Sequence, residues 1–120
     1  MKIAISSSGA ALEDQLDTRF GRAAGFILFD TETRSTLFIN NSQNLEAAQG
    51  AGIQSAQHVV NAGADVLITG HAGPKAFAVL TAAGVPVYLA KAGPVRQALA
   101  QWEAGKLIRI TGADVEGHWV

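Results

Sequence analysis

Two dipeptides recur at a regular spacing in the second half of the chain. Ala-Gly pairs end at Gly63, Gly84 and Gly105, which lie 21 residues apart, and Gly-Pro pairs stand at 73–74 and 93–94. Glycine is typical of the position just after a helix, and proline is typical of a helix's first turn. The spacing therefore predicts successive helix–strand units. The first 45 residues lack this pattern, so the chain is not a solenoid.

Apolar periodicity supplies the elements between these markers. Helical spacing begins at Ile53 and again after each Gly-Pro pair. Strands are expected at 2–7, 25–30, 37–40, 65–69 and 85–90, and a short run at 107–110 leaves one more open. Strands joined by helices run parallel, whereas the second and third strands form a hairpin. The predicted fold is α/β: a mixed five-stranded sheet, with an N-terminal antiparallel meander, then parallel strands, and with helices on its faces.

Composition excludes several classes of protein. The 120 residues carry a net charge of -1, which argues against a nucleic-acid-binding surface. No apolar run approaches the roughly 20 residues of a membrane span, and the N-terminus does not read as a signal peptide, so we expect a cytoplasmic protein. Cysteine is absent, which excludes a thiol nucleophile and thiolate-held metals. We expect residues 1–110 to form a single cofactor-binding domain and residues 111–120 a C-terminal tail.

Chemistry is expected where the predicted parallel strands end. The run Gly70-His71-Ala72-Gly73 joins a buried strand to a helix that starts at Pro74, so its turn offers free N–H groups to an anion. His71 and Lys75 add side-chain donors. Other small or cationic loops are expected at the same edge of the sheet. The candidate cofactor-binding residues are Ser8, Gly9, Arg19, Phe20, Arg22, Gly52, Gly70, His71, Ala72, Gly73 and Lys91.

A comparison of binding free energies indicates that side chains must supply most of the affinity for an anion. One helix N-terminus stabilises an anion by roughly 0.3–2 kcal/mol, whereas micromolar binding needs about 8 kcal/mol. We therefore expect Arg19, Arg22 and His71 to supply the rest. The alternatives are a solvated arginine loop paired with acidic neighbours, a core position for Phe20, and a solvated Lys91.

Nothing in the sequence favours catalysis. There is no phosphate-binding Walker loop, no nucleophile elbow, and no pair of carboxylates on the central strands. His58 and His118 stand apart from His71 and make no metal motif by spacing. The sequence thus predicts a binding protein that is not an enzyme and forms no direct bond to a metal.

Several motifs in order resemble the dinitrogenase iron-molybdenum cofactor biosynthesis family, which includes NifX-like proteins and the C-terminal part of NifB. They are the opening strand with Ser6-Ser7-x-Gly9, Asp17 to Ala23, Phe26 to Asp30, Gly50 to Gln54, Asp65 to Gly70, Gly73 to Phe77, and Glu116 to Trp119. The resemblance implies a ribonuclease H-like fold without that enzyme's carboxylates, and carriage of anionic metal–sulfur cofactors. A short, stand-alone, cysteine-free chain is most similar to members that hold a molybdenum–copper sulfide cluster non-covalently.

Three other functions stay open at this point. The first is carriage of an iron–molybdenum cofactor precursor in the same fold. The second is a small phosphate- or nucleotide-handling enzyme that uses the glycine-rich loops. The third is an interaction module without a ligand. The expected partners are the inorganic cluster and a protein that delivers or receives it, with no nucleic acid and no membrane.

Overall fold

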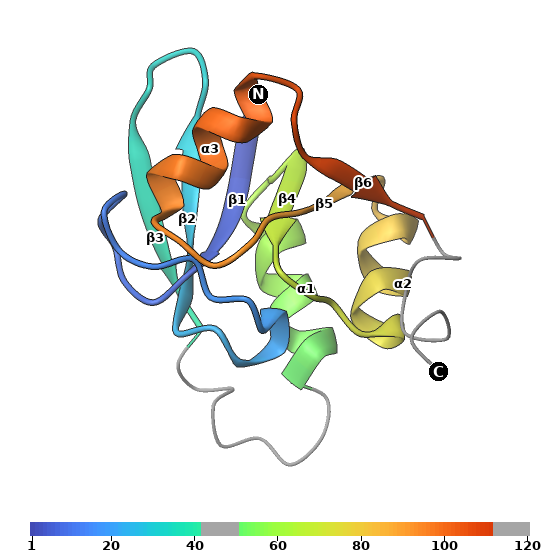
Figure 1. Cartoon of the computed structure of the whole chain (residues 1–120). Coiled ribbons are helices and arrows are strands. Elements are labelled where there is room, and N and C mark those ends of the chain that lie inside the picture. Colours follow the sequence, from blue (N-terminus) through green and yellow to red (C-terminus); the bar gives the residue numbers. More distant parts are fainter. Residues whose placement is uncertain (42–50, 112–120) are drawn as a thin grey trace.

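Six strands form one mixed sheet in the order β3-β2-β1-β4-β5-β6 (Figure 1). The computed structural model describes residues 1–41 and 51–111. The strands are β1 (Lys2–Ser7), β2 (Gly25–Asp30), β3 (Thr36–Asn40), β4 (Val66–Thr69), β5 (Val87–Leu89) and β6 (Ile108–Ile110). The helices are the short 3-10 helix η1 (Phe20–Arg22), α1 (Ala51–Asn61), α2 (Pro74–Ala82) and α3 (Val95–Glu103).

Strand directions follow the prediction for the first five strands. β1, β2 and β3 pair antiparallel as a meander, with Ile5 opposite Ile27. β1, β4 and β5 run parallel, with Ile5 opposite Ile68 and Ile68 opposite Tyr88. The predicted mixed sheet, with its meander and its parallel strands, is confirmed.

The predicted number of five strands is wrong, because a sixth strand, β6, extends the sheet at the edge formed by β5. β6 pairs antiparallel with β5, which places Ile110 opposite Val87. Ile110 is only 5% exposed and packs into the core, whereas Ile108 is 72% exposed. A three-residue run with one buried side chain carries too little periodicity to be separated from an extended tail. Of the predicted tail 111–120, all but Thr111 lies outside the described residues.

The sheet has a hydrophobic core on each face. Side chains of α1 and α2 cover one face, where Ala4, Phe20 and Leu67 are buried. Side chains of α3 cover the other face, where Ile3, Ile5 and Ile68 are buried. The alternation along β1 follows from the period-two geometry of a strand. Helices on opposite faces mean that loops at one edge of the sheet can lead to different sides of the molecule.

The recurring glycines end the three α-helices as predicted. Gly63, Gly84 and Gly105 have φ of +81°, +75° and +71°, a conformation that glycine adopts without steric cost. Pro74 is the first residue of α2 and follows the N-cap Gly73, while Pro94 is itself the N-cap of α3. Among residues 1–41 and 51–111, no helix combines the length and the apolar character needed to cross a bilayer.

Candidate functional site

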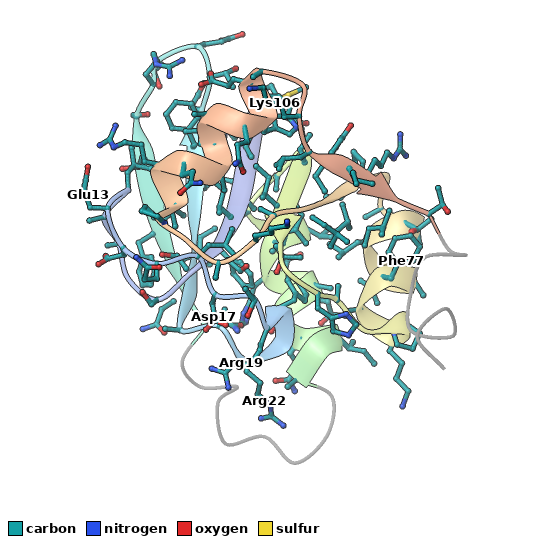
Figure 2. The ribbon with its side chains drawn as sticks, viewed as in Figure 1. Glu13, Asp17, Arg19, Arg22, Phe77 and Lys106 are labelled. Atoms are coloured by element: carbon teal, nitrogen blue, oxygen red, sulfur yellow. The ribbon has the colours of Figure 1, made fainter. Side chains whose placement is uncertain are left out.

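A cavity of about 560 Å³ lies where η1 meets the N-terminal ends of α1 and α2. Six of the predicted site residues line it: Arg19, Phe20, Arg22, Gly52, His71 and Gly73. Arg19 and Arg22 project from one end of the molecule, and Lys106 lies at the opposite end (Figure 2). The sequence prediction that the arginine loop and the His71 loop converge therefore agrees with the geometry.

Phe20 anchors the segment that carries the two arginines. Its side chain is 1% exposed, and its ring lies 5.2 Å from the ring of Phe26, centroid to centroid. Its backbone N–H donates to the carbonyl oxygen of His71 at 3.1 Å. Phe20 thus occupies the core position that the sequence left as an alternative, while still contributing to the cavity wall. One backbone hydrogen bond joins the arginine loop to the histidine loop.

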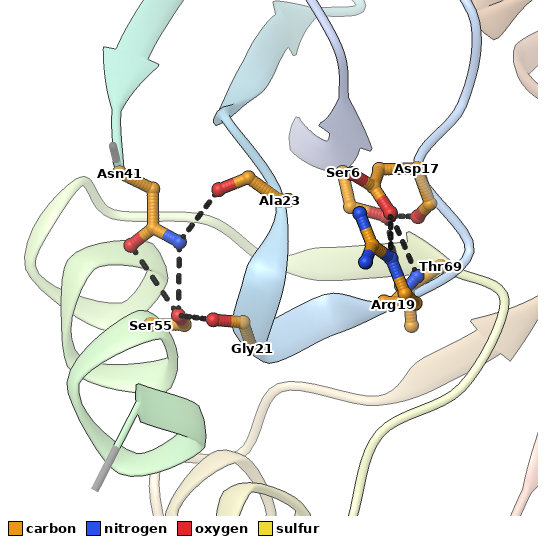
Figure 3. Close-up of polar contacts among 8 residues, drawn as sticks. All are labelled: Ser6, Asp17, Arg19, Gly21, Ala23, Asn41, Ser55 and Thr69. Carbon is orange, nitrogen blue, oxygen red and sulfur yellow. Dashed lines mark hydrogen bonds and ion pairs between the residues drawn. The ribbon is translucent and has the colours of Figure 1, made fainter. Parts of the chain in front are cut away.

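The backbone N–H and the Nε of Arg19 both contact Asp17, whose own backbone is bound by polar side chains of the sheet (Figure 3). Asp17 Oδ1 accepts from the Arg19 N–H at 2.9 Å and lies 3.5 Å from its Nε. The hydroxyl of Ser6, buried on β1, donates to the Asp17 carbonyl at 2.6 Å and is hydrogen-bonded with Thr69 Oγ1 at 2.8 Å. The Arg19 side chain stays 71% exposed. Its charge is therefore partly offset by Asp17 but remains accessible from solvent.

Two glycines allow η1 to lie directly against α1. A Cβ atom at Gly21 would stand 3.2 Å from both Cα and N of Gly52, which is closer than ordinary packing allows. Gly52 and Ile53 belong to the first turn of α1, where amide groups have no partner within the helix. The backbone contact thereby brings the positive end of the α1 dipole beside Arg22.

The start of α2 presents open amide groups to the same cavity. The first hydrogen bond of the helix runs from the Phe77 N–H to the Gly73 carbonyl at 2.9 Å, and Gly73 has no side chain to cap the end. Within the described part of the chain, no backbone carbonyl accepts from the amides of Lys75 or Ala76. Both residues line the cavity. An anion there would complete the hydrogen bonding of the helix end.

The cavity combines positive charge with apolar walls. Arg19, Arg22, His71 and Lys75 supply cationic or proton-donating side chains, and none of the described lining residues is acidic. The remaining wall comes from glycines and from apolar side chains, namely Phe20, Ile53, Pro74 and Ala76. Such a surface suits a weakly hydrated anion, because it offers charge and N–H groups without strong competing acceptors.

Five predicted site residues do not line this cavity, and four of them, namely Ser8, Gly9, Gly70 and Ala72, lie in loops or core next to it. Ser8 and Gly9 belong to a turn in which a Cβ at Gly9 would stand 2.3 Å from Asp14 Oδ2. At Gly70, a Cβ would stand 2.5 Å from the Cβ of Thr18, so this glycine permits a close approach between loops. Ala72 is 2% exposed and packs in the core beside α2. These positions shape the loops around the cavity.

Lys91 lines a different cavity, of about 370 Å³, beside α3 and β6. The amides at the start of α3 are already used there: Val95 N–H donates to the Asp14 carbonyl and Arg96 N–H to the Leu12 carbonyl, both at 2.8 Å. This helix end therefore cannot offer the same groups to a ligand as α2 does. The sheet lies between the helices that flank the two cavities, and this separates Lys91 from the arginines.

Several lining residues were absent from the predicted site. They are Gly21, Ile53, Pro74, Lys75 and Ala76. Lys75 and Pro74 stand in the helix start that the sequence analysis singled out, and Gly21 lies between the two arginines, so position along the chain could have found them. Ile53 and Ala76 carry no chemical signal in the sequence. Their place follows only from the way the two helices meet.

The described residues do not provide a set of side chains that could chelate a bare metal ion. Across residues 1–41 and 51–111, histidine and carboxylate side chains form no group of three that could hold one. The cavity instead provides guanidinium, imidazole, ammonium and amide N–H donors. This arrangement can bind an anion through its outer atoms.

Comparison with known proteins gives a consistent result. Residues 1–105 match the family described as dinitrogenase iron-molybdenum cofactor. The apo form of the orange protein from Desulfovibrio gigas has a TM-score of 0.89 and 39% identity, covering 92% of this chain and 93% of its own. A NifB-like protein of Thermotoga has a TM-score of 0.80 and 35% identity, covering 90% and 91%. An uncharacterised protein of Methanocaldococcus jannaschii is 28% identical over 111 residues, 89% of each chain. The chain belongs to the dinitrogenase iron-molybdenum cofactor family.

Proposed function

We propose that the protein binds and carries an anionic metal–sulfur cluster without catalysing a reaction on it. The cationic cavity carries this proposal, because Arg22, His71 and Lys75 meet two helix N-termini there with no acidic residue among the described lining. The cluster brings its own sulfide ligands and is held non-covalently. Guanidinium and amide groups donate to its sulfur atoms, and the apolar walls contact the sulfide faces.

The proposed cargo is a molybdenum–copper sulfide cluster. Support comes from the similarity to the orange protein, at 39% identity over nearly the whole chain, and from the absence of cysteine. A cluster that contains its own sulfide needs no protein thiolate, whereas other metal–sulfur centres commonly need one.

The strand order β3-β2-β1-β4-β5, with β2 antiparallel to β1, supports a ribonuclease H-like fold. We place this function in the cytoplasm, together with a protein that delivers or receives the cluster.

An iron–molybdenum cofactor precursor is the second candidate cargo. The family description and the NifB-like relative favour it. It is also an anion rich in sulfide, so the same cavity would accept it. Elemental analysis of the purified protein separates the two, since one cargo gives molybdenum with copper and the other gives iron with molybdenum.

Reconstitution tests the proposed site directly. The protein is mixed with tetrathiomolybdate and a copper(I) salt, desalted, and examined by absorption spectroscopy and elemental analysis. Wild type is expected to retain molybdenum and copper in fixed ratio. Arg22→Ala combined with His71→Ala is expected to lose the cluster during desalting, because two of the donors around it are removed, while the circular dichroism spectrum is unchanged.

A matched variant separates this cavity from the one beside α3. Lys91→Ala combined with Lys106→Ala likewise changes two residues, and it removes two cationic side chains from the second cavity. This variant is expected to retain the cluster as wild type does. Equal loss in both double variants would show that only the overall charge matters, and full retention in the first would remove the proposed site. A wild type that binds no thiometallate would contradict the function itself.

A further inference from the structure

A polar cluster lies at the junction of β3, η1 and α1, and Figure 3 shows its members Asn41 and Ser55. It consists of Asn41, which directly follows β3, and of Ser55 and His58 on α1. Asn41 and Ser55 are both fully buried, at 0% exposure. Burying a carboxamide is costly unless its donors and acceptors are all used. None of these residues lines the cavity.

Asn41 holds the chain on the exit side of η1. Its side-chain Nδ2 donates to the carbonyl of Ala23 at 3.0 Å, and its backbone N–H donates to the carbonyl of Ala24 at 2.9 Å. Ala23 directly follows Arg22 and is the C-cap of η1. The same Nδ2 donates to Ser55 Oγ at 3.0 Å. One side chain thus connects the end of the arginine segment to α1.

Ser55 completes the connection on the entry side. Its hydroxyl lies 3.5 Å from the carbonyl oxygen of Gly21 and 3.3 Å from Asn41 Oδ1, and its one proton is shared between these two acceptors. The carbonyl groups of Gly21 and Ala23 flank Arg22 on either side. Both are therefore tied, through Ser55 and Asn41, to the helix whose first turn lines the cavity.

His58 fixes the orientation of the carboxamide. Its Nδ1 lies 2.7 Å from Asn41 Oδ1, and an amide oxygen can only accept, so the imidazole donates there. This contact turns the Nδ2 of Asn41 towards Ala23 and Ser55. A side chain whose groups are all paired in a buried network has a single preferred orientation.

We propose that Asn41 is a positioning residue for the cluster: it sets Arg22 against the N-terminus of α1 without touching the cargo. The proposal rests on the cluster-binding function above. The hydrogen bonds on both sides of Arg22 keep its backbone, from which the guanidinium projects, at one fixed separation from the α1 amides. A compact cluster that contacts both groups then meets them already arranged, and no binding energy is spent on ordering the loop.

A double-variant cycle tests whether Asn41 acts through Arg22. Binding of the tetrathiomolybdate–copper(I) product is titrated for wild type, Asn41→Ala, Arg22→Ala and the combination. Each single variant is expected to weaken binding by about tenfold, the scale of one lost charged hydrogen bond. The combination is expected to bind no more weakly than Arg22→Ala alone. Multiplied losses in the combination would show that Asn41 contributes independently and would overturn the proposal.

Stability is controlled with a variant in the other core. Leu99 belongs to α3, is 4% exposed and packs into the core on the face of the sheet opposite to the cavity. Leu99→Ala lowers the melting temperature but is expected to leave thiometallate binding unchanged at temperatures where both variants are folded. A loss of binding in Leu99→Ala as large as that in Asn41→Ala would assign the effect to stability and overturn the positioning role.

A readout without cargo keeps this inference separate from the proposed function. In a ¹⁵N-labelled protein, the backbone N–H group of Arg22 is expected to have a lower order parameter in Asn41→Ala than in wild type or Leu99→Ala. Unchanged Arg22 dynamics would overturn the proposal even where wild type binds no thiometallate. Ser55→Ala replaces Asn41→Ala in every measurement where the latter does not fold, because it removes the bonds to Gly21 and Asn41 by deleting one hydroxyl.

Discussion

At the scale of single residues, the glycines of the site loops have different physical roles. A Cβ at Gly70 would collide with Thr18, standing 2.5 Å from its Cβ and 2.8 Å from its carbonyl oxygen. A Cβ at Gly73 would meet nothing within 4 Å, and its φ of −69° suits any residue. The sequence placed both glycines in one anion-binding turn. The structure separates a glycine required for packing from one that lies on the cavity wall.

The pair Gly70→Ala and Gly73→Ala tests that distinction. Gly70→Ala is expected to lower the free energy of unfolding by about 1–3 kcal/mol, because the loops at Thr18 and His71 must move apart. Gly73→Ala is expected to change it by less than about 1 kcal/mol, since only the N-cap preference differs. Urea denaturation measures both. Equal losses at the two positions would contradict the collision at Gly70.

At the scale of elements, β6 shows the limit of reading short strands from sequence. The regular glycine spacing and the apolar periodicity placed the helices and the first five strands, because each element is long or punctuated. β6 has three residues and one buried side chain, so its membership in the sheet is decided by pairing with β5. Such pairing depends on residues distant along the chain and leaves no local pattern.

Alanine variants of the two isoleucines measure the contribution of β6. Ile110→Ala is expected to cost about 2–5 kcal/mol of unfolding free energy, as for other large-to-small changes in a core. Ile108→Ala, at a position 72% exposed, is expected to cost less than about 0.5 kcal/mol. Both values come from urea titration monitored by tryptophan fluorescence. Two small and similar effects would mean that the strand does not pack on the sheet in solution.

The turn between β2 and β3 depends on one carboxylate. Asp30 Oδ1 accepts from the backbone N–H of Glu32 at 2.8 Å and of Thr33 at 3.4 Å. These hydrogen bonds, that from Glu32 foremost, hold the pKa of Asp30 below its ordinary value of 3.8. The ionised form is therefore favoured in the folded state. Its contribution to stability is complete above the pKa of the unfolded chain and is lost as the pH falls through the lower pKa of the folded chain.

Acid titration of Asp30→Ala checks this sign. The difference in unfolding free energy between wild type and Asp30→Ala is expected to stay constant from about pH 7 to about pH 5 and to shrink below about pH 4. Urea denaturation at a series of pH values provides the measurement. A difference that grows on acidification would show that the folded state raises this pKa.

At the scale of the whole molecule, charge is distributed unevenly over a chain that is nearly neutral. The net charge is -1, yet the main cavity gathers cationic groups without a described acidic residue in its lining. Composition alone therefore gave no sign of this cationic cavity. The motifs did, because arginines and glycine turns at strand ends could be placed at one edge of the sheet from the order of the elements.

The order of the elements could not tell which face of the sheet each loop leads to. Lys91 ends beside α3, whereas Arg22 and His71 end beside α1 and α2. Both placements satisfy the rule that ligand sites lie beyond the carboxyl ends of parallel strands. The side on which a helix packs depends on the full set of apolar contacts, so this part of the site required the structure.

Salt dependence tests the electrostatic account of the site. Affinity for the tetrathiomolybdate–copper(I) product is expected to fall as sodium chloride rises from about 0.01 M to about 1 M, because the screening length shortens from about 30 Å to about 3 Å. Arg22→Ala is expected to show a shallower dependence than wild type, and Lys91→Ala an unchanged one. An affinity that does not respond to salt would assign binding to the apolar walls.

The hydrogen bond from the Phe20 amide to the His71 carbonyl has a consequence for how the proposed cargo would leave. It joins the Arg19–Arg22 segment to the loop that carries His71, and both segments line the cavity. Neither segment can therefore move away from the other while this hydrogen bond stays intact. At a pH where exchange is faster than reclosing, deuterium uptake at that single amide therefore records each separation of the two segments. If the proposed cargo is released at the same rate as this uptake, separation of the two segments limits its release. If release is faster than uptake, the cargo leaves while the hydrogen bond between the segments is intact.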